Sequence, residues 1–216
     1  MSVEGRVKKH FDADAARFDA IYDEAKGPFQ RFVDDVWRGV VKRRYVLVLE
    51  RLEPLAGKSV LDVGCGSGRY CLAYAQRGAT RVVGVDFAAA MIELAQKHAA
   101  RLGVADRCDF RVGSFPEAVQ DGPFDASTAM GFFDYVADPA PILARMRELT
   151  RGTLIASFPK SREWRVPLRR LRFWAAGCPL FLYSEAGVRR LLEQAGVGRY
   201  DWIELDRDYI VVAQLG

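Results

Sequence analysis

Hydrophobic residues change their spacing along the chain, and each spacing predicts a different structural element. Near the N-terminus they recur every three or four positions, at Phe11, Ala15, Phe18 and Tyr22, which indicates an amphipathic helix. A second helical pattern follows and runs toward Leu52. We therefore expect two helices before the first strand.

Between residues 58 and 157, short apolar runs alternate with helical patterns, which predicts parallel strands joined by right-handed crossovers. The predicted strands lie near residue 60 and over 81–86, 110–115, 124–130, 152–157, 197–205 and 209–215. Helices are expected over 88–102 and 142–149 and from residue 184. With 216 residues and 50% hydrophobic content, the chain suits one well-buried domain. The predicted fold class is α/β, with a Rossmann-like, doubly wound and mostly parallel seven-stranded sheet.

The first strand ends in an acid and three alternating glycines, V-L-D-V-G-C-G-S-G-R-Y. Gly64, Gly66 and Gly68 allow the backbone to turn tightly and to approach a ligand that a side chain would block. A dinucleotide fingerprint would need its third glycine at position 69, where this chain has Arg69. A carboxylate from Asp62 at the mouth of the turn would repel a pyrophosphate, but it would suit an ammonium or a sulfonium.

This stretch resembles motif I of the class I S-adenosylmethionine-dependent methyltransferases, and later segments agree with that family in order and approximate spacing. The strand over 81–86 ends in Asp86, which matches the acid that accepts the ribose hydroxyls in this family. Ser114 stands where many members carry an acid, and Asp125 enters the predicted fourth strand. The resemblance implies that the chain binds S-adenosylmethionine and transfers its methyl group, but the motifs identify the cofactor rather than the acceptor. The favoured acceptor is an oxygen or nitrogen of a small molecule.

The cofactor contacts of the family can be carried over to the matching positions of this chain. They are Tyr22, Asp62, Gly64, Gly66, Gly68, Asp86, Phe87, Met91, Ser114, Phe115 and Met130. Met91 could equally be a core contact, and Tyr22 could equally pack its helix onto the sheet.

Four segments are expected within a single domain over residues 1–216. An N-terminal helical cap over 1–57 would cover the cofactor mouth, and the cofactor-binding core would span 58–157. A substrate-side insertion follows over 158–183, and a closing helix and strands fill 184–216. The insertion is longer than most connections, which suggests that it has structure or function of its own.

Candidate acceptor residues lie in the turn after the fourth strand and in the insertion. Methyl transfer from a sulfonium is an in-line displacement, so positioning the acceptor matters more than supplying a nucleophile. Asp134 and Tyr135 are the candidate catalytic residues, because either could remove or hold a proton, and they are expected first of all to line the substrate pocket. The predicted substrate contacts, which favour an acidic or amphiphilic acceptor, are Phe133, Trp164, Arg165, Arg169 and Arg170. A solvated basic helix is the competing interpretation of the arginines.

Two other classes of function remain open. A net charge of +4 and the basic insertion permit a methyltransferase that acts on RNA or protein, although nucleic acid is not the favoured partner. The second alternative is a catalytically idle nucleotide-binding protein of the same fold. The sequence does not indicate an oligomeric state.

Cysteines and histidines give no sign of a metal site. The four cysteines are scattered without a C-x-x-C pair, so we expect buried reduced thiols, no metal and a cytoplasmic location. His98 is expected on the solvent side of its helix, without a catalytic role. No apolar run of about 18 residues predicts a membrane span.

Overall fold

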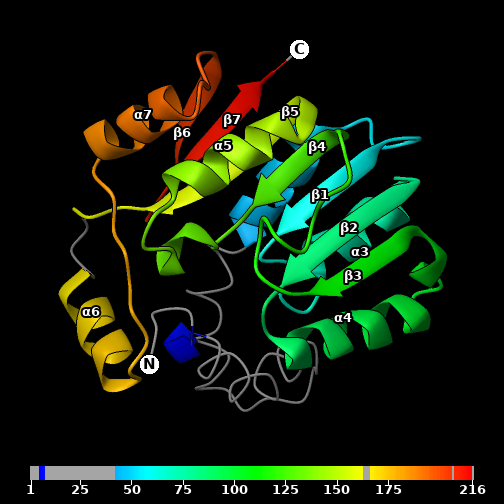
Figure 1. Ribbon diagram of the computed structural model, residues 1–216, viewed down its shortest axis with the longest axis horizontal. Coiled ribbons are helices and arrows are strands. Elements are labelled where there is room, and N and C mark those ends of the chain that lie inside the picture. The colour runs from blue at the N-terminus through cyan, green and yellow to red at the C-terminus, as the bar shows by residue number, and fades with distance from the viewer. Residues whose placement is uncertain (1–4, 8–41, 163–165, 206, 216) are drawn as a thin grey trace.

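The computed structural model describes residues 5–7, 42–162, 166–205 and 207–215. Within them, seven strands form one sheet in the order β3-β2-β1-β4-β5-β7-β6 (Figure 1). The strands are β1 (Ser59–Val63), β2 (Arg81–Asp86), β3 (Cys108–Val112), β4 (Phe124–Ala129), β5 (Thr150–Pro159), β6 (Tyr200–Leu205) and β7 (Asp208–Gln214). Neighbouring strands run parallel except at β7, which is antiparallel to both β5 and β6. This arrangement confirms the predicted fold class.

Helices cover both faces of the sheet (Figure 1). They are α3 (Arg69–Gln76), α4 (Ala89–Arg101), α5 (Ala140–Glu148), α6 (Val166–Ala175) and α7 (Glu185–Gln194). Residues 42–52 are also helical and share one face with α3 and α4, whereas α5 and α7 cover the other face. The end of the second predicted N-terminal helix is thus confirmed, and the first, around Phe18, lies outside the described residues.

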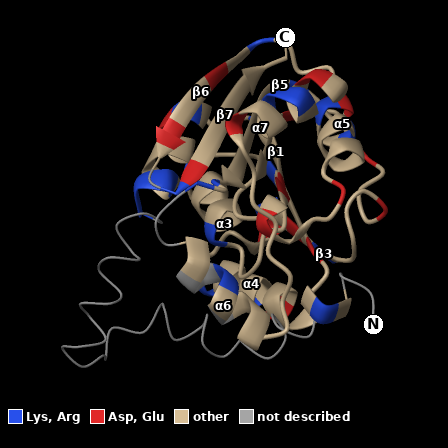
Figure 2. Cartoon of the chain, turned by 90° about the vertical axis from the view of Figure 1, so that its left-hand side faces the viewer, with Lys and Arg blue, Asp and Glu red and all other residues tan. Residues whose placement is uncertain are grey.

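Positively and negatively charged residues are interspersed along most elements (Figure 2). Helix α6 has the sequence V-P-L-R-R-L-R-F-W-A, which contains three arginines and no acid. Within the described part of the chain, no helix is long and apolar enough to cross a membrane.

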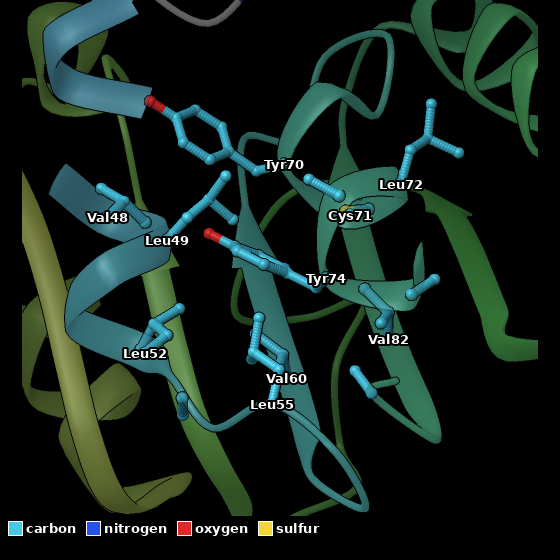
Figure 3. Close-up of a cluster of buried hydrophobic side chains, with 14 of the residues drawn as sticks. Val48, Leu49, Leu52, Leu55, Val60, Tyr70, Cys71, Leu72, Tyr74 and Val82 are labelled. Carbon is cyan, nitrogen blue, oxygen red and sulfur yellow. The ribbon is translucent and has the colours of Figure 1, made fainter. Parts of the chain in front are cut away.

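A buried cluster joins the helical residues 42–52 and α3 to the sheet (Figure 3). Leu49 and Leu52 pack here with Tyr74 above Val60 of β1. Burying a side chain of this size contributes roughly 1.5 to 3 kcal/mol. Tyr70 lies in the same cluster, and its hydroxyl points to the first turn of residues 42–52 (Figure 3). This packing fixes the first turn of that helix at the carboxyl-terminal edge of the sheet.

Strand β3 differs from its prediction, since it covers Cys108–Val112 rather than 110–115. It lies at the edge of the sheet and pairs only with β2. None of its five residues is fully buried, and polar Asp109 and Arg111 alternate with the apolar positions. An edge strand therefore lacks the continuous apolar run by which the buried strands were predicted.

The antiparallel direction of β7 brings a distant part of the chain to the carboxyl-terminal edge of the sheet. Asp208, the first residue of β7, is opposite Pro159, the last residue of β5. The start of β7 therefore lies beside the ends of β4 and β5, where open α/β sheets bind their ligands.

Candidate active site

Three glycines shape the turn between β1 and α3. Gly64, Gly66 and Gly68 have φ angles of 71, 53 and 81°, a left-handed conformation that residues with a side chain rarely adopt. A Cβ on Gly66 would meet no atom of the described residues within 4 Å. The backbone at Gly66 therefore borders open space, which a nucleoside could enter without displacing protein atoms.

Asp86, the last residue of β2, holds this turn from the neighbouring strand. Its Oδ2 accepts a hydrogen bond from the Gly66 amide at 2.9 Å, and its Oδ1 accepts one from the Ala88 amide at 2.9 Å. These two bonds fix the carboxylate beside the open side of the turn, with half-buried Phe87 next to it. A carboxylate has about four acceptor positions, so this geometry fits the predicted binding of ribose hydroxyls.

Asp62 lies beneath the turn, which corrects the expected position at its mouth. The carboxyl is buried, where Oδ1 accepts a hydrogen bond from Thr128 Oγ1 at 2.7 Å and Oδ2 accepts one from Cys71 Sγ at 3.4 Å. Burial raises the pKa of Asp62 to about 7, although the two hydrogen bonds act in the opposite direction. Asp62 faces inward because Thr128 on β4 and Cys71 on α3 donate hydrogen bonds to its carboxyl there.

The other predicted cofactor residues differ in accessibility. Met91, Phe115 and Met130 are buried, and Ser114 is half-buried. Tyr22 lies outside the described residues. Cofactor contacts by these side chains stay predictions, and the burial of Met91 agrees with the alternative of a core contact.

His98 supports the glycine turn from below. It is buried, and its Nδ1 lies 3.5 Å from the carbonyl oxygen of Ser67 in that turn. The prediction that His98 faces solvent is therefore wrong. The reason is that α4 packs against α3 as well as against the sheet, so a larger part of its circumference is covered.

The turn after β4 lies directly against the glycine turn after β1. A Cβ on Gly64 would be 2.5 Å from Phe132 Cδ2, so the two residues are in contact. Strands β1 and β4 are neighbours at the point where the strand order reverses, which is the usual ligand-binding position in open α/β sheets. Sequence reasoning missed Phe132, because the contact depends on strand order rather than on a local pattern.

The predicted catalytic residues lie in the 3-10 helix η3 (Phe133–Tyr135), where the insertion meets them. Asp134 is only 7% exposed, and its carbonyl oxygen accepts a hydrogen bond from the Phe181 amide at 2.8 Å. Tyr135 packs against Phe173 of α6, with ring centroids 5.9 Å apart. The structure therefore brings α6 and the C-terminal end of the insertion to the turn after β4.

Other residues that were predicted to bind the acceptor are either in the core, on the surface of α6 or outside the described part of the chain. Phe133 is fully buried and stacks on Phe158 with ring centroids 4.7 Å apart, so the structure corrects its assignment from acceptor contact to core residue. Arg170 is exposed on α6, as the solvated-helix interpretation expects. Trp164 and Arg165 lie outside the described residues, as does the side chain of Arg169.

A buried ion pair near Asp134 was not predicted. Arg44 Nη1 lies 3.3 Å from Asp208 Oδ2, and both side chains are largely buried. Burial lowers the pKa of Arg44, but Tyr70, Asp208 and Asp134 outweigh that effect and raise the pKa above its ordinary value. The two partners are 164 positions apart in the chain, so no local pattern indicates them.

Residues 55–193 match the model of a family described as a methyltransferase domain. The chain belongs to the class I S-adenosylmethionine-dependent methyltransferases. This methyltransferase is 42% identical over 170 residues to a ubiquinone biosynthesis O-methyltransferase of Neisseria meningitidis serogroup A, covering 74% of the chain and 61% of the relative. It is 37% identical over 105 residues to the enzyme of that name from Paracidovorax citrulli, covering 48% of the chain and 43% of the relative. The matches thus span about half of these relatives.

Solved structures confirm the fold of this methyltransferase. The magnesium protoporphyrin IX methyltransferase of Synechocystis, with bound S-adenosylhomocysteine, has a TM-score of 0.75 at 21% identity, over 97% of this chain and 98% of that one. The geranyl diphosphate C-methyltransferase of Streptomyces coelicolor has a TM-score of 0.77 at 14% identity, over 100% and 98%. The family match supports the predicted cofactor, S-adenosylmethionine.

Proposed function

We propose that this methyltransferase methylates a hydroxyl oxygen of a small molecule held over the ends of β4 and β5, and that Asp134 accepts the hydroxyl proton. One observation carries the proposal. The buried carboxyl of Asp134 belongs to the turn after β4, and Phe132 of that turn contacts Gly64 of the glycine turn, where the cofactor is expected to bind. S-adenosylmethionine, when bound, supplies a methyl group on a sulfonium. The protein then has to orient the acceptor, exclude water and remove one proton.

The surroundings of Asp134 suit a proton acceptor. The carboxyl lies near the guanidinium of Arg44, whose pKa it helps to raise. It also lies near Tyr183, where burial first and Asp134 second raise the pKa of the phenol. Because Tyr183 keeps its proton at neutral pH, a carboxylate is the better base at this place. Tyr135 would then form an aromatic wall of the site with Phe173.

Relatives of this chain support oxygen as the methylated atom. The Neisseria and Paracidovorax relatives are both named as O-methyltransferases of ubiquinone biosynthesis. The two solved structures are less than 25% identical to this chain and bear only on its fold. We therefore choose a hydroxyl over a nitrogen.

An amphiphilic acceptor is supported by the surface of α6. Leu171 and Trp174 are 59% and 79% exposed, and Arg170, which precedes Trp174 by four positions and so lies on the same side of the helix, is also exposed. Phe173 of the same helix is buried and contacts Tyr135. An acceptor with an apolar part and an acidic group would meet both kinds of side chain at this border of the site.

The test uses catechol and 3,4-dihydroxybenzoate as acceptors, with mass spectrometry to detect a gained methyl group. The variant Asp134→Asn should lower kcat by about a hundredfold, because general base catalysis contributes factors of this order. Its affinity for S-adenosylhomocysteine should stay that of the wild type. The matched control is Asp138→Asn, which removes an exposed acid from the same loop. Wild-type kcat in Asp134→Asn, or no methylation of either compound by the wild type, would refute the proposal.

A further inference from the structure

We propose that Arg44 and Tyr70 bind an oxygen anion of the methyl acceptor, either a carboxylate or an ionised hydroxyl. This inference rests on the proposed function, since it concerns the acceptor side of the same site. Both residues lie outside the set that the sequence indicated. They come from two elements, the helical residues 42–52 and α3, which pack together at the carboxyl-terminal edge of the sheet.

The guanidinium of Arg44 is buried and only partly used by Asp208. Its side chain is 13% exposed, and it contacts Asp208 through Nη1 alone, at 3.3 Å. Its Nε is buried and has no hydrogen-bond acceptor among the described residues. A guanidinium carries five N–H donors in a planar fork that fits two oxygens at once. One long contact therefore leaves donors of Arg44 for a second oxygen ligand.

The hydroxyl of Tyr70 is a second buried donor beside this guanidinium. Tyr70 is 8% exposed, and a side-chain hydrogen bond with Arg44 contributes to its pKa, although no partner of its Oη among the described residues has normal hydrogen-bond geometry. Its ring is held between Tyr45 and Tyr74, with centroids 5.5 and 6.2 Å away. Burial raises the pKa of Tyr70 even though the neighbouring Arg44 lowers it, so the hydroxyl keeps its proton and remains a donor.

These donors lie on the acceptor side of the site. A Cβ on Gly131, the second residue after β4, would be 3.4 Å from Arg44 Nη2. The Gly131 amide donates to Ser157 Oγ at 2.7 Å, which fixes this point between β4 and β5. The next residue of the turn is Phe132, which contacts the glycine turn. A group bound by Arg44 and Tyr70 would therefore lie next to the cofactor turn and near Asp134.

The charges nearby define the class of ligand. Buried donors without acceptors are costly, and an oxygen anion would satisfy both with charge-assisted hydrogen bonds. Asp208 and Asp134 already lie close to the guanidinium and would repel a strongly charged group. A single negative charge, as in a carboxylate or a phenolate, therefore fits better than a diphosphate.

The test measures binding of 3,4-dihydroxybenzoate and of catechol to the protein saturated with S-adenosylhomocysteine, by calorimetry. Arg44→Lys keeps the charge beside Asp208 but loses the planar fork, so the Kd of 3,4-dihydroxybenzoate should rise about tenfold or more. Tyr70→Phe should raise it by a smaller factor. The matched control is Arg51→Lys, because Arg51 lies in the same helical segment and pairs with Asp201 of β6 at 2.5 Å, on the exposed surface.

The two sources of the oxygen anion give different results. If Arg44 holds a carboxylate, Arg44→Lys weakens only 3,4-dihydroxybenzoate, and catechol binds as before. If it holds the ionised hydroxyl, both compounds bind more weakly, and the pH dependence of binding changes in the variant. Either result supports the inference when Arg51→Lys and the affinity for S-adenosylhomocysteine match the wild type.

Three results would overturn the inference. They are wild-type affinities for both compounds in Arg44→Lys, no binding of either compound by the wild type, and equal losses in Arg44→Lys and Arg51→Lys. Methylation assays separate this failure from failure of the proposed function. If the wild type methylates catechol and Arg44→Lys does so equally well, only the inference fails. If the compounds bind through Arg44 and are not methylated, only the proposed function fails.

Discussion

Gly64 and Phe132 are in such close contact that no side chain fits between them, since a Cβ on Gly64 would be 2.5 Å from Phe132 Cδ2. Gly64 belongs to the turn after β1, and Phe132 belongs to the turn after β4. The contact joins the part of the site that faces the cofactor to the part that carries Asp134. A substitution at Gly64 should therefore affect the turn after β4, and a substitution at Phe132 should affect the glycine turn.

A double-mutant cycle tests this contact. Gly64→Ala should be destabilising for two reasons, the left-handed φ of 71° and the clash with Phe132. In the background Phe132→Ala the contact at 2.5 Å is removed and only the Phe132 Cβ at 3.2 Å remains, so the cost of Gly64→Ala should fall by about 1 kcal/mol or more. The free energy of unfolding in urea measures both costs. Gly103→Ala is the control for strain alone, because Gly103 has a φ of 67° and no atom within 4 Å of its Cβ position. Additive costs would show that Phe132 does not restrict Gly64.

The second prediction concerns the open side of the glycine turn. Gly66→Val places a branched side chain in the space that the cofactor would occupy, so binding of S-adenosylhomocysteine should be lost in calorimetry. Gly103→Val carries similar backbone strain far from the turn and should keep wild-type affinity. Full affinity in a folded Gly66→Val protein would mean that Gly66 does not line the cofactor site.

The third prediction concerns Asp86. Asp86→Ala removes the acceptor for the Gly66 amide and the proposed acceptor for the ribose hydroxyls. An unpaired buried donor costs about 1 to 3 kcal/mol, so the Kd of S-adenosylhomocysteine should rise about tenfold or more. Thermal unfolding checks that the variant is folded. Asp109→Ala, which removes an exposed acid of β3, should leave the Kd unchanged, and an equal effect of both variants would contradict the assignment.

The fourth prediction follows from the buried carboxyl of Asp62. Its pKa of about 7 lies above the ordinary value of 3.8, so between these pH values the folded protein holds a proton that the unfolded chain has lost. The stability that protonated Asp62 contributes is therefore present below pH 4 and is lost as the pH rises toward 7. Asp62→Asn imitates the protonated form. Its stability relative to the wild type should grow with pH, by up to about 4 kcal/mol by pH 8.

Urea unfolding at pH 5, 6, 7 and 8 measures this difference. Asp125→Asn is the control, because the hydrogen bond from Arg151 holds the pKa of Asp125 below its usual range. Its stability difference from the wild type should be constant over these pH values. A constant difference for Asp62→Asn would show that Asp62 is ionised throughout.

The central strands could be predicted from the sequence because they are buried on both faces. Strand β2 was predicted with the bounds that the structure shows, Arg81–Asp86, since its middle residues form a continuous apolar run. Strand β3 was misplaced because its polar alternation is that of an exposed edge. Burial of His98 was missed for a related reason, since helix-to-helix packing covers polar positions that periodicity assigns to solvent.

The candidate site was predictable where it is local in sequence. The three glycines lie within five positions, and Asp86 ends the very next strand, so spacing alone indicates them. Arg44 and Asp208 could not be found in this way. They meet only because residues 42–52 pack beside α3 and because β7 is inserted antiparallel between β5 and β6. The ion pair follows from the topology of the sheet. Spacing patterns in a single sequence do not show which strands and helices, far apart in the chain, lie side by side.

The family match ends on both sides before it reaches the buried ion pair. It covers residues 55–193, so the glycine turn, Asp86 and Asp134 lie inside it, whereas Arg44 precedes it and Asp208 follows it. A hybrid whose single exchanged flank comes from an enzyme without this pair would bury a charge without its partner, which is strongly destabilising. Exchanging both flanks together leaves neither Arg44 nor Asp208 without its partner. The two flanks therefore have to be exchanged together when acceptor choice is engineered in this methyltransferase.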